Sequence, residues 1–154
     1  MSADAMTLRI DIGDWQALKH AAQAVRHEVF VIGQQIPVEL EWDDMDALSL
    51  HAVAINETGR AIGTARLLPD FHIGRMAVLE SERGKGIGSR LLQAMMDAAR
   101  ERGATEVVLN AQVDAMPFYR RHGFVEEGEV FDDAGIPHRL MRHRFASSSS
   151  PQSS

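Results

Sequence analysis

The pattern of apolar and polar residues predicts a series of strands and helices between Thr7 and Phe145. At the start, TLRIDI (7–12) alternates apolar and polar residues, as a half-buried strand does. Asp14 follows where a helix N-cap is expected, because a carboxylate there accepts hydrogen bonds from the first turn. Apolar residues then recur at intervals of three or four, which predicts an amphipathic helix whose buried face comprises Trp15, Leu18, Ala22, Val25 and Val29.

Two further strands flank a turn in the middle of the chain. The segments SLHAVAIN (49–56) and AIGTARLLP (61–69) are both rich in apolar residues. Asn56 and Gly59 suit the turn between them, because glycine adopts a positive φ without steric cost. We therefore expect a β-hairpin here, followed by a third strand in HIGRMAVLE (72–80).

The next segment, ESERGKGIGSRLLQAMMDAARERG (80–103), predicts a glycine-rich turn that opens into a helix. Its apolar stripe comprises Leu91, Leu92, Met95, Met96 and Ala99. Gly103 is suited to end the helix, and TEVVLNA (105–111) then predicts a buried strand. A strand, a helix and a strand in this order predict a right-handed parallel crossover.

The C-terminal part predicts a short helix and two strands. DAMPFYRRH (114–122) has Asp114 as a candidate cap and Pro117 in the first turn, where proline is tolerated. VEEGEVF (125–131) and IPHRLMRHRF (136–145) predict strands joined by the turn residues DDAG. The tail 146–154 is serine-rich, so we expect a single domain over 1–145 and a disordered tail.

Composition narrows the classes of function. The chain has 154 residues, 45% of them hydrophobic, and no apolar run approaches the roughly 18–20 residues that span a bilayer. We expect a cytoplasmic protein that does not bind membranes. The formal net charge of -6 argues against a nucleic-acid-binding surface, and the absence of cysteine excludes thiolate chemistry and disulfides.

The turn RGKGIGS (83–89) is a candidate anion-binding site. Main-chain N–H groups at a helix N-terminus have no intrahelical partner, so they bind phosphate readily. Glycines let the phosphate approach the main chain, and Arg83 and Lys85 add positive charge. Alternatively, the glycines only form a tight turn and the cations are solvated. The Walker motif does not fit, because Lys85 is followed by Gly86, and the dinucleotide fingerprint fails at Ser89.

The spacing Arg83-x-x-Gly86-x-Gly88, between the strand RMAVLE and a helix, resembles the acetyl-CoA signature of the GNAT superfamily of N-acetyltransferases. The resemblance implies an α+β fold with a central, mostly antiparallel sheet, one parallel splayed strand pair and flanking helices. It also implies a co-substrate, acetyl-CoA, and a coenzyme site. The coenzyme-binding residues would be Met76, Ala77 and Val78 for the pantetheine arm, Arg83, Gly84, Lys85, Gly86, Ile87, Gly88 and Ser89 for the pyrophosphate, and Asn110 and Phe118 at the thioester end.

Acetyl transfer to an amine needs a neutral amine, a stabilised oxyanion and a proton for the departing thiolate. Tyr119, the only tyrosine, lies in PFYRRHGF, which resembles the GNAT segment whose tyrosine lies beside the coenzyme sulfur. The resemblance implies that its phenol is the general acid. The alternative is a core aromatic residue on a short helix. The oxyanion donor would be a main-chain N–H near Val78.

A second pattern resembles a small bacterial GNAT subgroup and the N-terminal half of acyl-homoserine-lactone synthases, which share the fold. Both have an arginine four residues before a phenylalanine, and a Glu-x-Asp-x-x-Asp run. The resemblance implies that Glu41 is the base or an amine-binding carboxylate. It also implies an acceptor site that includes Arg26, Phe30, Asp43, Asp46, Arg66 and His138. The alternative is a solvated acidic loop. We expect His51 to be structural, and we predict no metal site.

These patterns predict an acetyl-CoA-dependent N-acetyltransferase that acts on a primary amine, with a small molecule as its acceptor. The acidic run favours a cationic acceptor. Two alternatives are an acyl-homoserine-lactone synthase-like acyltransferase and a non-catalytic acyl-CoA-binding sensor module. The resemblance also allows a homodimer, because dimers are common in the family.

Overall fold

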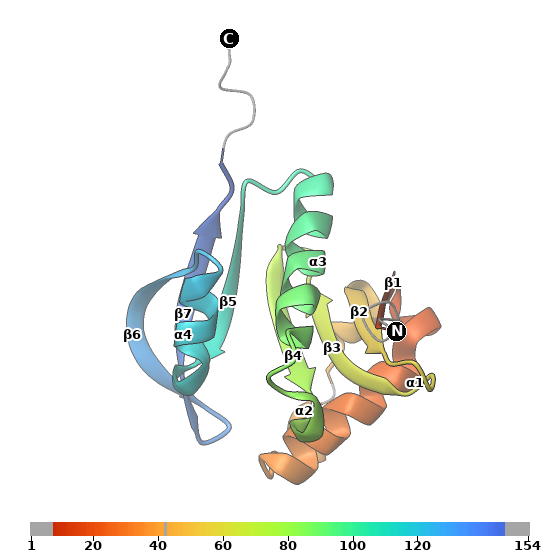
Figure 1. The fold of residues 1–154 in the computed structure, drawn as a ribbon. Helices are drawn as coiled ribbons and strands as arrows, with labels where there is room; N and C mark the ends of the chain where they lie inside the picture. Colours follow the sequence, from red (N-terminus) through yellow and green to blue (C-terminus); the bar gives the residue numbers. More distant parts are fainter. Residues whose placement is uncertain (1–7, 42, 147–154) are drawn as a thin grey trace. The chain divides into compact units, whose positions relative to one another are not determined.

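The chain forms two compact units, whose division falls between Met95 and Met96, within helix α3 (Ile87–Glu101). The computed structural model, shown in Figure 1, describes residues 8–41 and 43–146. The predicted tail therefore lies outside the described residues except for Ala146. In the part of the chain described, no helix is long and apolar enough to cross a membrane.

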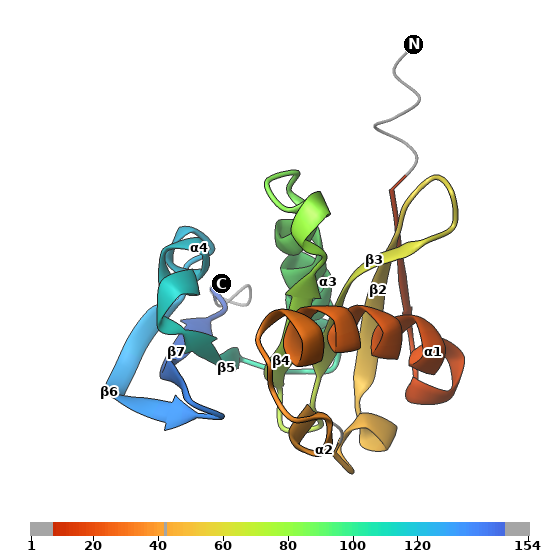
Figure 2. The ribbon, with the colours of Figure 1, turned by 90° about the horizontal axis from the view of Figure 1, so that it is seen from below.

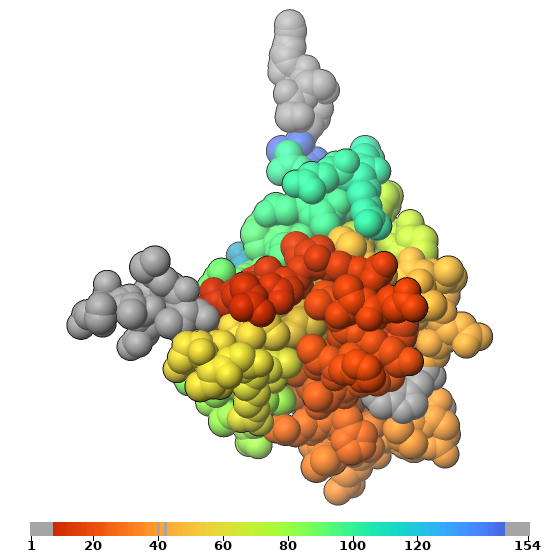
Figure 3. Space-filling view, turned by 90° about the vertical axis from the view of Figure 1, so that its right-hand side faces the viewer, coloured from red at the N-terminus to blue at the C-terminus, as the bar shows by residue number. Residues whose placement is uncertain are grey.

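The N-terminal unit contains four antiparallel strands in the order β1-β2-β3-β4. These are β1 (Arg9–Gly13), β2 (Leu50–Ile55), β3 (Ala61–Leu67) and β4 (His72–Val78). Figure 2 shows α1 (Trp15–Arg26) lying across the strands of this unit. Ala22 of α1 packs with Val53 and Ile55 of β2 in the core, because the apolar stripe of the helix faces the sheet. Figure 3 shows α1 and β1 at the surface on one face of this unit.

The predicted helix after Asp14 is confirmed. Asp14 caps it, accepting a hydrogen bond of 2.9 Å from the Ala17 N–H. After Arg26 the chain continues as a π-helix, His27–Gly33, in which Val29 and Phe30 are buried. A short helix α2 (Val38–Glu41) and a 3-10 turn (Asp46–Leu48) lead into β2.

The predicted hairpin is also confirmed. The Asn56 side-chain oxygen accepts hydrogen bonds of 3.0 Å from the N–H groups of Thr58 and Arg60, which closes the turn. Gly59 has a φ of 86° there, as expected for glycine.

Strand β4 contains a bulge. Thr64 of β3 lies opposite Ala77, but Arg66 lies opposite Gly74, so one residue of β3 faces both Arg75 and Met76. Arg75 has a φ of 47°, in the left-handed region. A residue other than glycine loses about 1–3 kcal/mol in this conformation, and surrounding contacts must hold it there.

A 3-10 turn (Glu80–Glu82) and the glycine turn connect β4 to α3. The predicted apolar stripe of α3 is buried, with Leu91, Leu92 and Met95 at 0% exposure. Gly103 follows the helix with a φ of 95°, as expected for a glycine that ends it.

The C-terminal unit contains β5 (Glu106–Gln112), α4 (Met116–Arg121), β6 (Val125–Asp133) and β7 (Ile136–Arg144). Strand β7 lies between β5 and β6 and is antiparallel to both. The predicted cap at Asp114 is wrong, because a 3-10 turn (Val113–Ala115) precedes α4 and Ala115 is the N-cap. Pro117 is in the first turn, as predicted.

Candidate active site

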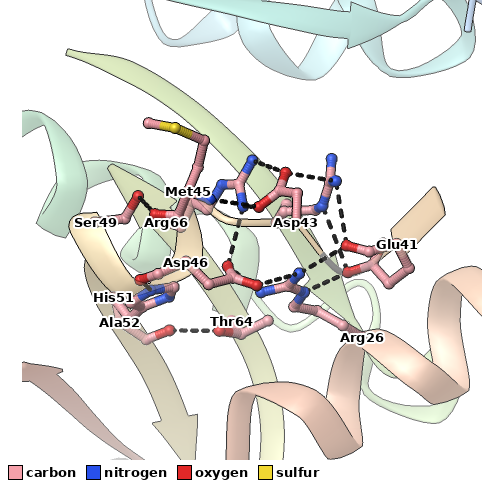
Figure 4. A network of polar contacts seen from close by, with 11 residues as sticks. Arg26, Glu41, Asp43, Met45, Asp46, Ser49, His51, Ala52, Thr64 and Arg66 are labelled. Atoms are coloured by element: carbon pink, nitrogen blue, oxygen red, sulfur yellow. Dashed lines mark hydrogen bonds and ion pairs between the residues drawn. The ribbon is translucent and has the colours of Figure 1, made fainter. Parts of the chain in front are cut away.

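Six charged side chains of the N-terminal unit form a closed ring in which positive and negative charges alternate. Figure 4 shows most of these contacts. The ring draws on elements far apart in the sequence, from the end of α1 to β4. In order around the ring, its members are Arg26, Glu41, Arg75, Asp43, Arg66 and Asp46.

Arg26 connects two of the carboxylates. Its Nε donates to Glu41 Oε2, and its Nη2 donates to the Glu41 carbonyl oxygen at 3.1 Å. Its Nη1 and Nη2 donate to both carboxylate oxygens of Asp46, at 2.8 and 3.1 Å. The Arg26 side chain is 1% exposed, so these hydrogen bonds replace the water that the guanidinium loses on folding.

The other two arginines close the ring. Arg66 Nη1 donates to Asp43 at 2.8 Å and to Asp46 at 3.0 Å. Arg75 Nη2 donates to the Glu41 carbonyl oxygen and to Asp43 Oδ2, both at 3.2 Å. The Arg75 Nε also lies 3.5 Å from Glu41 Oε2. Arg75 and Asp43 are the more exposed members, with side chains 27% and 33% exposed.

The ring corrects one alternative for the acidic run. Glu41 and Asp46 are 2% and 3% exposed, so a solvated acidic loop is the wrong description for them. The three carboxylates pair with three guanidinium groups. The charges of the run are therefore compensated within the ring, and the cationic acceptor stays a prediction.

Burial and ion pairing act in opposite directions on the two carboxyl groups that meet Arg75. Burial raises the pKa of Glu41, against the charges of Arg26 and Arg75. Burial also acts to raise the pKa of Asp43, but the hydrogen bond and charge of Arg66, with the charge of Arg75, lower it overall. Glu41 therefore binds a proton more readily than an ordinary glutamate does, whereas Asp43 binds one less readily than an ordinary aspartate does.

His51 supports the ring from β2. Its Nε2 lies 2.9 Å from the Asp46 carbonyl oxygen, and its ring packs against Trp15 with centroids 4.7 Å apart. Burial lowers the pKa of His51, which favours the neutral imidazole. These contacts agree with the structural role expected for it.

The glycine turn is exposed and open. Gly84 and Gly86 both have a φ of 81°, and no heavy atom lies within 4 Å of the position that a Cβ would occupy on either. The first N–H groups of a helix have no intrahelical partner, so a turn in this position can present donors at the positive end of the helix dipole.

The two cations of the turn have partners within the turn region. Arg83 Nε donates to the Val78 carbonyl oxygen at 3.0 Å, which ties the turn to the end of β4. Lys85 Nζ lies 3.1 Å from Glu82 Oε1 and stays exposed. Strand β4 thus leads from the bulge, through Met76, Ala77 and Val78, directly to this turn.

The remaining predicted residues lie in the C-terminal unit. Tyr119 on α4 is half-buried, and burial raises the pKa of its phenol to about 12. Phe118 packs edge-on against the Tyr119 ring, with centroids 5.1 Å apart, and Asn110 is exposed on β5. His138 on β7 has its Nδ1 2.7 Å from the Ile136 carbonyl oxygen and stacks on Phe131.

The structure thus brings together Arg26, Glu41, Asp43, Asp46 and Arg66, as the second sequence pattern predicts. Phe30 is buried in the π-helix, which begins directly after Arg26. Sequence reasoning missed Arg75, although it lies in the predicted strand and immediately precedes Met76.

Several solved structures share the fold of this chain. An acyl-CoA N-acyltransferase from Pseudomonas aeruginosa has a TM-score of 0.79 and 31% identity, and covers 89% of this chain and 99% of its own. Escherichia coli ElaA has a TM-score of 0.80 and 25% identity, and the match covers 88% of this chain and 99% of the ElaA chain. The predicted α+β, GNAT-like fold class is confirmed.

The sequence comparisons identify the family. Residues 16–145 match the model of the acetyltransferase (GNAT) domain. The uncharacterized N-acetyltransferase YjcF of Bacillus subtilis is 40% identical over 121 residues, which cover 76% of this chain and 86% of that relative. The chain belongs to the GNAT acetyltransferase family and is an acyltransferase.

Proposed function

We propose that this protein transfers an acetyl group from acetyl-CoA to the primary amine of a small molecule. The observation that carries the proposal is the open turn before α3, where Gly84 and Gly86 expose the main chain at positive φ. Phosphate oxygens would accept hydrogen bonds from these N–H groups. The residues present therefore fit the pyrophosphate of coenzyme A.

The N–H groups of β4 would bind the pantetheine arm and the thioester. A strand next to a bulge offers main-chain groups that a regular ladder would already use. We assign Met76, Ala77 and Val78 to this role, with an N–H near Val78 as the oxyanion donor. Asn110 and Phe118 would line the thioester end.

Tyr119 is the proposed donor to the leaving sulfur. A pKa of about 12 keeps the phenol protonated throughout the neutral range. A thiol has a reference pKa of about 8.5, so complete transfer from this phenol to the thiolate is unfavourable. Tyr119 would therefore stabilise the thiolate mainly as a hydrogen-bond donor.

The charge ring is the proposed acceptor site. Asp43 has a third of its side chain exposed, so it is the carboxylate that can contact an acceptor ammonium group directly. Glu41 remains the candidate base, since its raised pKa favours proton acceptance. Arg26, Asp46 and Arg66 would hold these carboxylates in place, and Phe30 and His138 remain proposed contacts.

A matched pair of glycine variants tests the coenzyme site. Gly86→Ala and Gly59→Ala both place a Cβ at positive φ in open space, so both should cost about 1 kcal/mol of stability. Only Gly86→Ala should reduce the rise in Tm that acetyl-CoA produces, because a ligand stabilises the native state according to its affinity. An equal rise in both variants and the wild type would remove the turn from the coenzyme site.

Turnover tests the chemical role of Tyr119. Release of free thiol from acetyl-CoA is followed with a panel of small primary amines. Tyr119→Phe should lose about 100-fold in kcat, within the range for the loss of one positioned hydrogen-bond donor, and should keep its acetyl-CoA-induced rise in Tm. Unchanged turnover would remove Tyr119 from the mechanism.

A further inference from the structure

We infer that Arg75 is a positioning residue: its contacts with Glu41 and Asp43 hold the bulge of β4 and thereby set the direction of the Met76–Val78 main chain. The inference rests on the proposed function, because it assigns a cause to the geometry of the proposed thioester-binding strand. It concerns the backbone of β4 and is separate from any contact between the ring and the acceptor.

The first step is the conformation of Arg75. It has a φ of 47°, although Gly74, directly before it, could adopt a positive φ at no steric cost. The left-handed region is unfavourable for arginine, so contacts elsewhere must maintain it. The backbone of β4 alone would favour a regular strand.

The second step is what the side chain contacts. Arg75 reaches the main-chain oxygen of Glu41 and the carboxylates of Glu41 and Asp43, at 3.2 to 3.5 Å. Glu41 is the last residue of α2 and Asp43 follows the helix, so both partners lie more than 30 residues earlier in the chain. That segment is itself fixed by Arg26 and Arg66. Arg75 therefore attaches the bulge to a buried and cross-linked part of the unit.

The third step is the position of the bulge. Regular pairing with β3 resumes at Ala77, opposite Thr64, and at Val78, opposite Gly63. A bulge changes the direction in which the following N–H and C=O groups point. Loss of the bulge would shift the register by one residue and turn the main chain of Met76 and its neighbours away from the thioester.

A pair of substitutions separates this role from a general loss of charge. Arg75→Ala and Arg75→Gly remove the same side-chain contacts, but only glycine adopts the left-handed conformation without cost. We expect Arg75→Ala to raise the Kd for acetyl-CoA about tenfold, which is within the range that the left-handed strain of a residue other than glycine can produce. We expect Arg75→Gly to raise the Kd less than about threefold, because glycine adopts this conformation without strain. The Kd is measured by calorimetry on the full chain, well below the Tm of each variant.

Ala134→Gly provides the control. Ala134 also has a positive φ, of 54°, but lies in the turn between β6 and β7, outside the ring. Its substitution should leave the Kd for acetyl-CoA unchanged. Equal Kd values for Arg75→Ala and Arg75→Gly would overturn the inference, whether both match the wild type or both are raised. If the wild type itself does not bind acetyl-CoA, the proposed function fails instead, so the two failures are distinguishable.

Discussion

Replacement of Arg26 by methionine tests whether the charge ring contributes to the stability of the fold. Methionine has a similar length and keeps the packing of the buried stem, but it lacks the guanidinium group. Among the described residues, the substitution removes two hydrogen bonds to Glu41 and two to Asp46. Their loss leaves two carboxylates with side chains only 3% and 4% exposed.

The structure indicates how large the loss should be. Asp46 keeps its ion pair with Arg66 at 3.0 Å, so its charge stays compensated. Glu41 keeps only the longer contact with Arg75 Nε, at 3.5 Å, among its carboxylate contacts in the described residues. Removal of one partner from a buried pair typically costs about 3–5 kcal/mol. Since whole domains are stable by about 5–15 kcal/mol, the variant should be severely destabilised.

Urea unfolding followed by far-ultraviolet circular dichroism measures this loss. Arg60→Met is the matched control, because Arg60 pairs with Glu28 at 3.8 Å with both side chains more than half exposed. That variant should change the free energy of unfolding by less than about 1 kcal/mol.

A double variant identifies the cause of the loss. Arg26→Met with Glu41→Gln removes the uncompensated charge, so it should be more stable than Arg26→Met alone by about 1–3 kcal/mol. A loss below about 1 kcal/mol for Arg26→Met would refute the reasoning. Additive losses in the double variant would also refute it, because they would show that the charge left on Glu41 is not the source of the instability.

Three further predictions concern individual residues. Since Tyr119 is the only tyrosine, the absorbance of the phenolate reports its titration alone, and its midpoint should be about pH 12 in the folded protein, against about 10 in urea. Because the folded state has the higher pKa, the free energy of unfolding should fall as the pH rises from 10 to 12. Asp43→Asn should be less stable than the wild type at neutral pH, and this difference should vanish in acid-unfolding curves as the pH falls below 3.8 and through the lowered pKa of Asp43. Gly63→Ala should lose about 1–3 kcal/mol in thermal unfolding, because its Cβ would lie 2.9 Å from Leu91 Cδ1 and 3.2 Å from Ile87 Cγ2.

The elements that depend on local signals were predictable from the sequence. Asp14 and the apolar spacing after it identified α1, and Asn56 with Gly59 identified the hairpin turn. These features depend on residues close together in the chain, so the sequence alone is sufficient to predict them. The π-helix at His27–Gly33 was not predictable, because its apolar residues continue the same spacing as an ordinary helix.

The ring was predictable in part. The pattern that contains Arg26, Glu41, Asp46 and Arg66 indicated that these residues share a site, but not that they are buried and neutralise one another. Arg75 was missed because its place in the ring depends on a left-handed residue in a bulge of β4. No local signal marks an arginine for that conformation.

The alternating ring has a consequence for how this sequence can diverge. Each member forms ion pairs with two neighbours of opposite sign, so a single replacement removes one ion pair from the neighbour on either side of it. Exchange of one member is tolerable only alongside a second change that restores the balance. Substitutions at these six positions should therefore occur together in evolution, whereas exposed positions such as Arg60 can be substituted one at a time.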